Sequence, residues 1–276
     1  MNVSRNTATS LSEHNKFSQL IQLLGHKAVD IVISVGKASR FMTTMILQTA
    51  ICWRRPNLLI KEVYFVGVLS LVIIIVSGLF VGLVMGLQMY ETLKRFGSGS
   101  IVGMVVALSL VRELGPVLSA LLISSRAGSA VTAEIGLMKA TEQLSAMEMM
   151  AIQPVSRVVV PRFWAGVISV PLLTSIFNVM GIFGGYLVAV QFIGVDEGLF
   201  WSQMQEAVNF RIDVVNGFIK SVIFGFAIML IAVFQGYYSE PTAEGVSTAT
   251  TRTVVTSALA ILSLDFVLTA FMFRGV

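Results

Sequence analysis

Two adjacent residues of opposite charge, Arg112 and Glu113, lie inside the otherwise apolar stretch from Ile101 to Ser125. A charge at the depth of a bilayer costs several kcal/mol unless it is paired or hydrated. Consecutive side chains of a helix point about 100° apart, so these two need separate partners or a polar cavity. Either one of them contacts the polar or anionic headgroup of a ligand, or they form interhelical ion pairs with Lys220 or Asp265, which lie in other apolar stretches.

The sequence offers little for enzymatic catalysis. Its two histidines, His14 and His26, are both close to the N-terminus, and its one cysteine is Cys52, so no Ser-His-Asp or Cys-His set and no metal site is expected. No GxxxxGK[ST] phosphate loop is present, and the glycines between residues 97 and 103 lack the spacing of a dinucleotide fingerprint. We therefore expect a non-catalytic chain that binds no cofactor, with any energy source in another chain.

Soft apolar side chains share one helical face near the end of the preceding apolar stretch, Val63 to Tyr90, and just beyond it. The four are Met85, Met89, Leu93 and Phe96. Such side chains adapt to ligands and to cores alike, so this face predicts either the wall of an apolar cavity or packing. On the same helix Gly78, Gly82 and Gly86 clear a groove for another helix or for a lipid chain.

The stretch from Ser129 to Met150 has a helical pattern in which charged residues alternate with methionines and other apolar residues, and Pro154 ends it. An amphipathic, methionine-rich helix between two membrane crossings can dock in a groove on a partner protein. The alternative is a helix that rests on the membrane surface.

The elements that must position these residues are membrane helices. Of the 276 residues, 55% are hydrophobic and 12% are charged, with a mean hydropathy of +0.84, which water-exposed domains do not show. Since about 20 apolar residues cross a bilayer, we predict five crossings. They are Val63 to Tyr90, Ile101 to Ser125, Phe163 to Ile193, Val214 to Tyr238 and Thr253 to Phe273.

Upstream of the crossings, the apolar residues from Phe17 to Met45 follow the spacing of one helical face. We expect this helix to lie in the headgroup plane. The predicted organisation is therefore an N-terminal extension at 1–16, an interfacial amphipathic region at 17–61 and a five-helix membrane domain at 62–276. The fold class is all-α and polytopic.

Lysine and arginine predict the orientation. The N-terminal region and the alternate connections on its side contain most of them, including Arg126, Lys139, Arg157, Arg162 and Arg252. The opposite side has only Lys94, Arg95, Arg211 and Arg274. The positive-inside rule then places the N-terminus in the cytoplasm and the C-terminus on the far side. The loop at 194–213 faces outward, and we expect a short helix in it.

Three long motifs resemble the MlaE/YrbE permease family of bacterial lipid transporters. They are LSLVRELGPVLSALLISSRAGSAVTAEIGLMKATEQLSAMEMM, then PRFWAGVISVPLL, and ATTRTVVTSALAILSLDFVLTA near the end. The similarity extends from about Leu23 to Phe273.

The resemblance implies the permease subunit of an ABC transporter in the bacterial inner membrane. Such a transporter moves phospholipids between the inner and outer membranes and so maintains outer-membrane lipid asymmetry. It implies a homodimer with a separate cytoplasmic ATPase pair that uses ATP and magnesium. It also implies a STAS-domain protein bound to the ATPase and a periplasmic hexamer of MCE-domain subunits. The C-terminus would then be periplasmic.

The resemblance also assigns roles to residues. Arg112, Glu113 and Leu114 of the RELGP motif would line a lipid pocket at the dimer interface, together with the face formed by Met85, Met89, Leu93 and Phe96. A coupling helix at about 129–150 would sit on the ATPase through Glu134, Met138, Glu142 and Met147. The amphipathic N-terminal helix would help hold the membrane anchors of the MCE subunits.

The alternative is an ion-coupled secondary transporter, which predicts inverted repeats and several buried carboxylates. Glu113 and Asp265 alone give this alternative thin support, and the sequence shows no repeat. A lipid-modifying enzyme would need a nucleophile or metal that the sequence does not provide.

Overall fold

The computed structural model describes residues 33, 36–49 and 56–272, and every regular element within them is helical. The chain separates into two units, residues 1–47 and 48–276. In the first unit, residues 36–47 are helical. The predicted extension at 1–16 and most of the amphipathic segment from Phe17 lie outside the described residues, so the interfacial helix stays a prediction.

The described part of the second unit contains five helices long and apolar enough to cross a bilayer, which confirms the predicted all-α polytopic fold. We number them helix 1 to helix 5: Pro56–Arg95, Gly99–Ala140, Val155–Phe192, Phe210–Tyr237 and Ala243–Met272. All five run past the predicted apolar stretches at one or both ends. The predicted domain boundary at residue 61 falls inside the first element of helix 1.

Most of these helices contain irregular turns. Helix 1 consists of α2 (Pro56–Val66), the 3-10 turn η1 (Val68–Ser70) and α3 (Leu71–Arg95). Helix 2 consists of η2 (Gly99–Ile101), α4 (Val102–Ser109), the π-helical η3 (Leu110–Leu114), α5 (Gly115–Ile123), the π-helical η4 (Ser124–Gly128) and α6 (Ser129–Ala140). Helix 3 consists of the π-helical η5 (Val155–Val159), α8 (Val160–Tyr186) and the π-helical η6 (Leu187–Phe192). Helix 4 begins with the π-helical η7 (Phe210–Val214) and continues as α10 (Val215–Tyr237), and helix 5 is α11 (Ala243–Met272).

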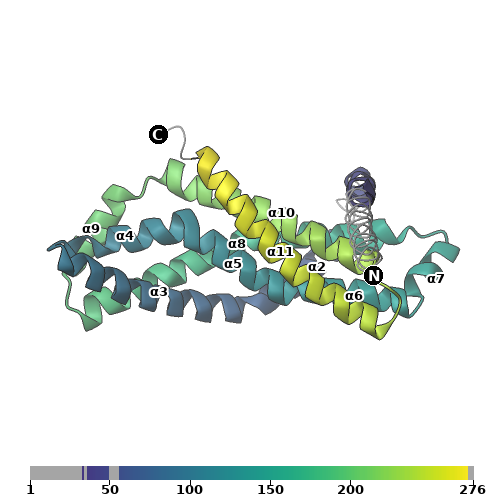
Figure 1. The fold of residues 1–276 in the computed structure, drawn as a ribbon, viewed down its shortest axis with the longest axis horizontal. Helices are drawn as coiled ribbons and strands as arrows, with labels where there is room; N and C mark the ends of the chain where they lie inside the picture. The colour runs from purple at the N-terminus through teal and green to yellow at the C-terminus, as the bar shows by residue number, and fades with distance from the viewer. Residues whose placement is uncertain (1–32, 34–35, 50–55, 273–276) are drawn as a thin grey trace, which may run out of the picture. The chain divides into compact units, whose positions relative to one another are not determined.

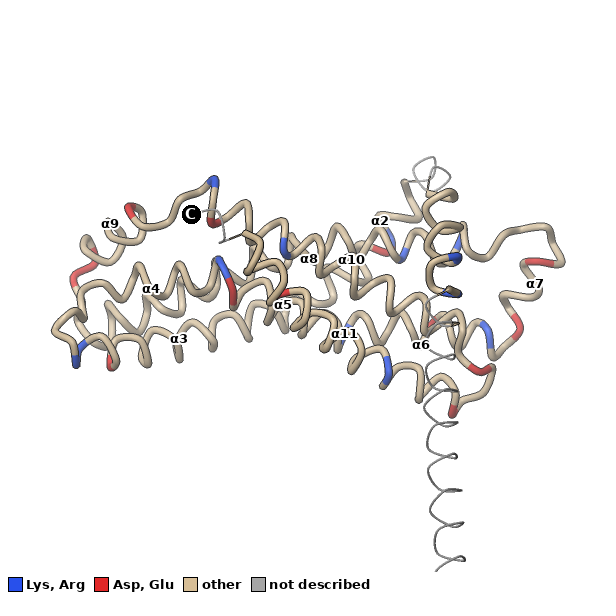
Figure 2. Tube along the Cα trace, turned by 45° about the horizontal axis from the view of Figure 1, so that its top comes forward, with Lys and Arg blue, Asp and Glu red and all other residues tan. Residues whose placement is uncertain are grey.

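The helices of this unit lie side by side, and their connections gather at two ends (Figure 1). One end has α7 (Gln143–Met149) and is called the α7 end; the other has α9 (Glu197–Ala207) and is called the α9 end. Helix α9 confirms the short helix predicted in the loop, and the Asp196 carboxylate caps it by accepting from the Leu199 N–H at 2.8 Å. Charged residues concentrate toward the two ends, and a few of both signs lie between them (Figure 2).

Helix α8 is the centre of the packing. It packs against α3, α10, α2 and α5, and half of the apolar window of helix 3, like that of helix 4, is buried, against 11% for helix 5 and 22% for helix 1. Gly82 and Gly86 of α3 approach the backbone of Gly181 and Gly185 on α8 so closely that a Cβ at Gly82 would collide with the Gly181 carbonyl. The glycine groove predicted on helix 1 is therefore filled by another helix.

Two expectations are wrong in detail. The segment at 129–150 is not one helix, because α6 ends at Ala140 and Glu142 adopts a left-handed conformation (φ 58°) before α7. No glycine or proline marks this break, so the sequence pattern predicts a continuous helix across it. In addition, Arg126, Lys139 and Arg162 lie in helices and not in connections, with their side chains bound to neighbouring helices.

Candidate functional site

A cluster of charged side chains, here called the central cluster, lies in the parts of helices 2, 4 and 5 toward the α9 end and contains Arg112, Glu113, Asp213, Lys220 and Asp265. Lys220 of α10 is its centre, and its side chain is only 1% exposed. The Lys220 ammonium donates to the Glu113 carboxylate at 2.9 Å, to Asp265 at 3.2 Å and to the Thr269 hydroxyl at 2.7 Å. An ammonium has only three N–H donors, and with the Arg112 carbonyl described below it has four acceptors around it, so its hydrogen-bonding capacity is fully used.

The local sequence of helix 2 prepares this contact. Pro116 has no N–H with which to bind the carbonyl of Arg112 four residues earlier. The Lys220 ammonium reaches that same carbonyl at 3.1 Å. Helix α10 can approach because Gly217 lies against the Val111 carbonyl, where a Cβ would collide. Pro116 of helix 2 and Gly217 of α10 therefore allow the Lys220 ammonium to donate to a backbone carbonyl of the π-helical turn η3.

Arg112 has a different partner. Its Nε donates to Asp213 Oδ1 at 2.7 Å, and the second oxygen of Asp213 accepts from the Asn209 N–H at 2.7 Å. The Asp213 side chain is fully buried in η7, where helix 4 begins, whereas the Arg112 side chain is 36% exposed. Asp213 thus holds the Nε edge of the Arg112 guanidinium, and the Arg112 side chain as a whole stays partly accessible.

The cluster combines two cations with three carboxyl groups, and its members differ in accessibility. Lys220 and Asp213 are enclosed, while Glu113, like Arg112, is 36% exposed. The interhelical ion pair considered for Glu113 is present, and so is a Lys220–Asp265 pair. The ion pairs therefore leave Arg112 and Glu113 partly accessible, whereas Lys220 and Asp213 are not.

The other predicted pocket residues lie elsewhere in the unit. Met85, Met89 and Leu93 are half-buried on α3, and Phe96 is 79% exposed at the end of that helix. Helix α3 packs mainly on α8 and α4, whereas the central cluster is built between helix 2, α10 and α11. Leu114 is half-buried within η3, next to Glu113. None of the contacts described for the central cluster involves the apolar α3 face.

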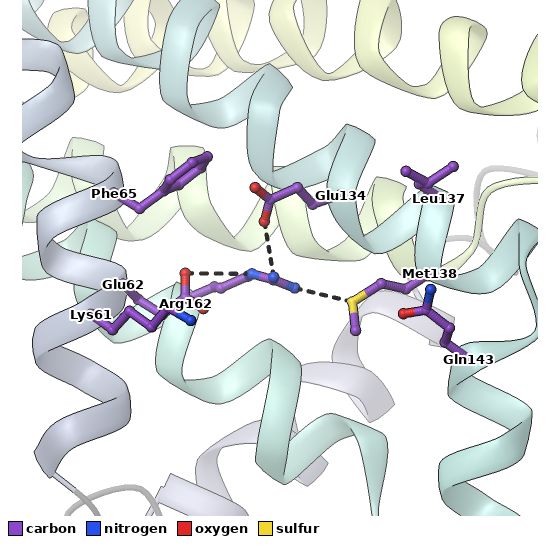
Figure 3. A pocket seen from close by; sticks show the side chains of 8 residues that line it. All are labelled: Lys61, Glu62, Phe65, Glu134, Leu137, Met138, Gln143 and Arg162. Atoms are coloured by element: carbon purple, nitrogen blue, oxygen red, sulfur yellow. Dashed lines mark hydrogen bonds and ion pairs between the residues drawn. The ribbon is translucent and has the colours of Figure 1, made fainter.

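The predicted coupling residues are also divided. Glu134 and Met138 of α6 face Arg162 of α8: Glu134 pairs with Arg162 at 2.9 Å, and the Met138 sulfur lies 3.6 Å from it (Figure 3). Glu142 is exposed in the turn after α6, and Met147 is half-buried in α7. The adjacent Met149 and Met150 are 84% and 63% exposed, so the end of α7 presents an apolar surface.

Sequence reasoning missed several members of these clusters. Thr269, which contacts both Lys220 and Glu113, lies one helical turn after Asp265, a spacing that places both on one face. Asp213 is the last acidic residue before the apolar part of helix 4, which is the available signal for it. Glu62 was not singled out, although it directly precedes the charge-free part of helix 1.

Comparison with known proteins gives consistent matches. The family described as "Permease MlaE" matches residues 59–271. The intermembrane phospholipid transport system permease protein MlaE of Haemophilus influenzae is 53% identical over 253 residues, which cover 92% of this chain and 97% of that protein. A probable ABC transporter permease protein of Rickettsia bellii is 37% identical, covering 91% of this chain and 96% of its own length. The chloroplastic protein TRIGALACTOSYLDIACYLGLYCEROL 1 of Arabidopsis thaliana is 30% identical over 83% of this chain and 65% of its own length.

Proposed function

The chain belongs to the MlaE permease family, and on that premise we propose that it is the membrane-spanning permease subunit of an ABC transporter that moves phospholipids between the inner and outer membranes. The observation that carries the proposal is the extent of the match. It covers residues 59–271, which reach into all five membrane helices and include every member of the central cluster. The printed function of the Haemophilus relative supplies the substrate class.

Within this function, Arg112, Glu113 and Leu114 contact the lipid. A guanidinium attracts phosphate and can bind it through more than one N–H, and the Arg112 side chain is accessible at 36%. Lys220 is enclosed and holds helices 2, 4 and 5 together. Lys220 and Asp213 therefore position the residues that meet the headgroup.

The acyl chains meet the α3 face formed by Met85, Met89, Leu93 and Phe96. No described contact joins this face to the central cluster within one chain, which favours a pocket completed by a second copy. We therefore place the lipid pocket at a homodimer interface. The low burial of helices 1 and 5 leaves their apolar sides available to a second copy and to lipid.

The energy comes from a separate subunit, because this sequence lacks a phosphate-binding loop. We propose that the ATPase subunits, which bind ATP and magnesium, dock at the α7 end through Glu142, Met147 and the exposed Met149 and Met150. A STAS-domain protein binds the ATPase. The α7 end is then cytoplasmic, and a periplasmic hexamer of MCE-domain subunits meets the α9 end of this inner-membrane protein.

Native mass spectrometry of the complex, extracted in mild detergent with this chain tagged, tests the proposal. The expected spectrum shows two copies of this chain with an ATPase pair, MCE subunits and bound phospholipid. A chain that leaves the membrane without an ATPase in every detergent would contradict it and favour an ion-coupled transporter. The matched comparison is the double variant Met149→Asp, Met150→Asp, which should lose the ATPase and keep the dimer.

A further inference from the structure

A cavity of about 360 Å³ lies at the α7 end, away from the central cluster, where helices 1, 2 and 3 meet. Its charged lining residues are Lys61 and Glu62 from α2, Glu134 from α6 and Arg162 from α8 (Figure 3). Phe65 and Leu137 add an apolar wall, and Leu137 is 58% exposed. The cavity therefore combines two cations, two carboxylates and an apolar side.

Arg162 is the most enclosed of these charges, with its side chain 12% exposed. Its Nη2 lies 2.9 Å from the Glu134 carboxylate, while its Nε is 3.5 Å from Glu62. That Nε is buried and has Glu62 as its ion-pair partner, but at 3.5 Å this contact does not form a hydrogen bond, and no other described residue accepts one from it. A buried donor without an acceptor is costly, so a ligand oxygen that supplied one would be stabilised here.

The depth of the cavity in the membrane follows from the sequence. Glu62 directly precedes the charge-free stretch from Val63 to Tyr90, and Arg162 directly precedes the charge-free stretch from Phe163 to Ile193. Two helices thus change from charged to fully uncharged at the level of this cavity. Such a change marks the boundary between headgroups and hydrocarbon.

From these observations we propose that the cavity binds the headgroup of a zwitterionic phospholipid from the leaflet on the α7 side. The lipid phosphate faces Lys61 and the Nε edge of Arg162, its ammonium faces Glu62 and Glu134, and its acyl chains leave past Phe65 and Leu137. The balanced lining charge favours a headgroup with one positive and one negative group over an anionic one. This site is separate from the transport site, and only its assignment to the cytoplasmic leaflet rests on the proposed function.

The test uses the whole transporter in its native membranes with Leu137 replaced by a photoreactive benzoylphenylalanine. After illumination, the mass of the adduct on the intact chain identifies what occupies the cavity. We expect a phospholipid adduct that is enriched in zwitterionic lipid relative to the bulk membrane. A protein adduct, a soluble phosphorylated amine or a lipid mixture equal to that of the bulk membrane would overturn the proposal.

Charge reversal of Lys61, at the mouth of the cavity, tests the site, and Lys94→Glu is its matched control. Lys61 is exposed and forms no ion pair with the described carboxylates within 4.0 Å, so Lys61→Glu leaves the Arg162 bridges intact. We expect Lys61→Glu to lower the lipid adduct roughly fivefold, since it places repulsion beside the phosphate. Lys94→Glu, at the α9 end of the same helix 1, should leave the adduct unchanged. An equal response of the two variants would reject the site.

Arg112→Ala separates this inference from the proposed function. The variant changes the central cluster and does not touch the cavity, so the Leu137 adduct should persist whether or not transport is lost. Loss of the adduct in Arg112→Ala would show that the cavity does not bind lipid independently of the central cluster.

Discussion

Lys220 in the central cluster and Arg162 at the α7 end are built alike, because each holds carboxylates from two other helices. Lys220 holds Glu113 and Asp265, and Arg162 holds Glu134 and Glu62. Their surroundings differ: Lys220 is 1% exposed between apolar stretches, whereas Arg162 is 12% exposed beside a cavity at the edge of such stretches. Because the cost of an unpaired charge rises with distance from water, the central bridge must stay closed, while the edge bridge can exchange a contact for a ligand.

The largest expected effect is that of Lys220→Met. The substitution keeps the approximate volume but leaves Glu113 and Asp265 close together without their cation. Removing one partner of a buried pair costs about 3–5 kcal/mol, so most of the protein should fail to fold or should unfold at a much lower temperature. Thermal unfolding of the detergent-solubilised protein measures this. The exposed Lys94→Met is the control, and equal unfolding temperatures for the two variants would refute the structural role of Lys220.

The corresponding change at the edge, Arg162→Met, should be milder. Glu62 and Glu134 are as exposed as Asp265 and Glu113, at 22% and 36%, but they lie at the edge of charge-free stretches, where water can hydrate them once the arginine is gone. We expect a loss of about 1–2 kcal/mol in the same unfolding measurement. A loss of stability as large as that caused by Lys220→Met would contradict the proposed difference between the Lys220 and Arg162 sites.

Asp213→Asn should have the smallest effect on stability and sharpens the division of roles inside the central cluster. An asparagine can still accept from the Asn209 N–H, but it no longer holds Arg112 by charge. We expect a loss of about 1 kcal/mol in stability and a clear defect in phospholipid transfer between donor and acceptor vesicles. Asp196→Asn, at the exposed cap of α9, serves as the control. Unchanged transfer by Asp213→Asn would mean that Arg112 needs no such anchor.

The membrane fold was predictable because lipid imposes one strong rule, a long uncharged stretch for each crossing. The helix ends were not, because helices extend into the headgroup region, where composition no longer constrains them. Helix 1, for example, begins at Pro56, before its charge-free stretch opens at Val63. The break at Glu142 was missed for a related reason, since a left-handed residue without glycine gives no local signal.

The charged clusters were predictable only in part. Glu113 has few candidate partners in apolar sequence, so its pairing with Lys220 could be foreseen as one of two options. The Arg112–Asp213 pair could not, because it depends on how η7 enters the membrane. The contact of Lys220 with the Arg112 carbonyl depends on Gly217 and Pro116 from two helices, and such a combination emerges only in three dimensions.

The most direct test of the central claim, that Arg112 meets the lipid while Lys220 and Asp213 hold the site together, is the transport activity of Arg112→Ala measured beside its assembly. The account predicts a complex with normal subunits that unfolds at a lower temperature, because the buried Asp213 loses its cation, and that has lost phospholipid transfer and bound phospholipid. Arg252→Ala on α11 should retain both. An Arg112→Ala chain that fails to assemble, or one that assembles and transports normally, would contradict the account.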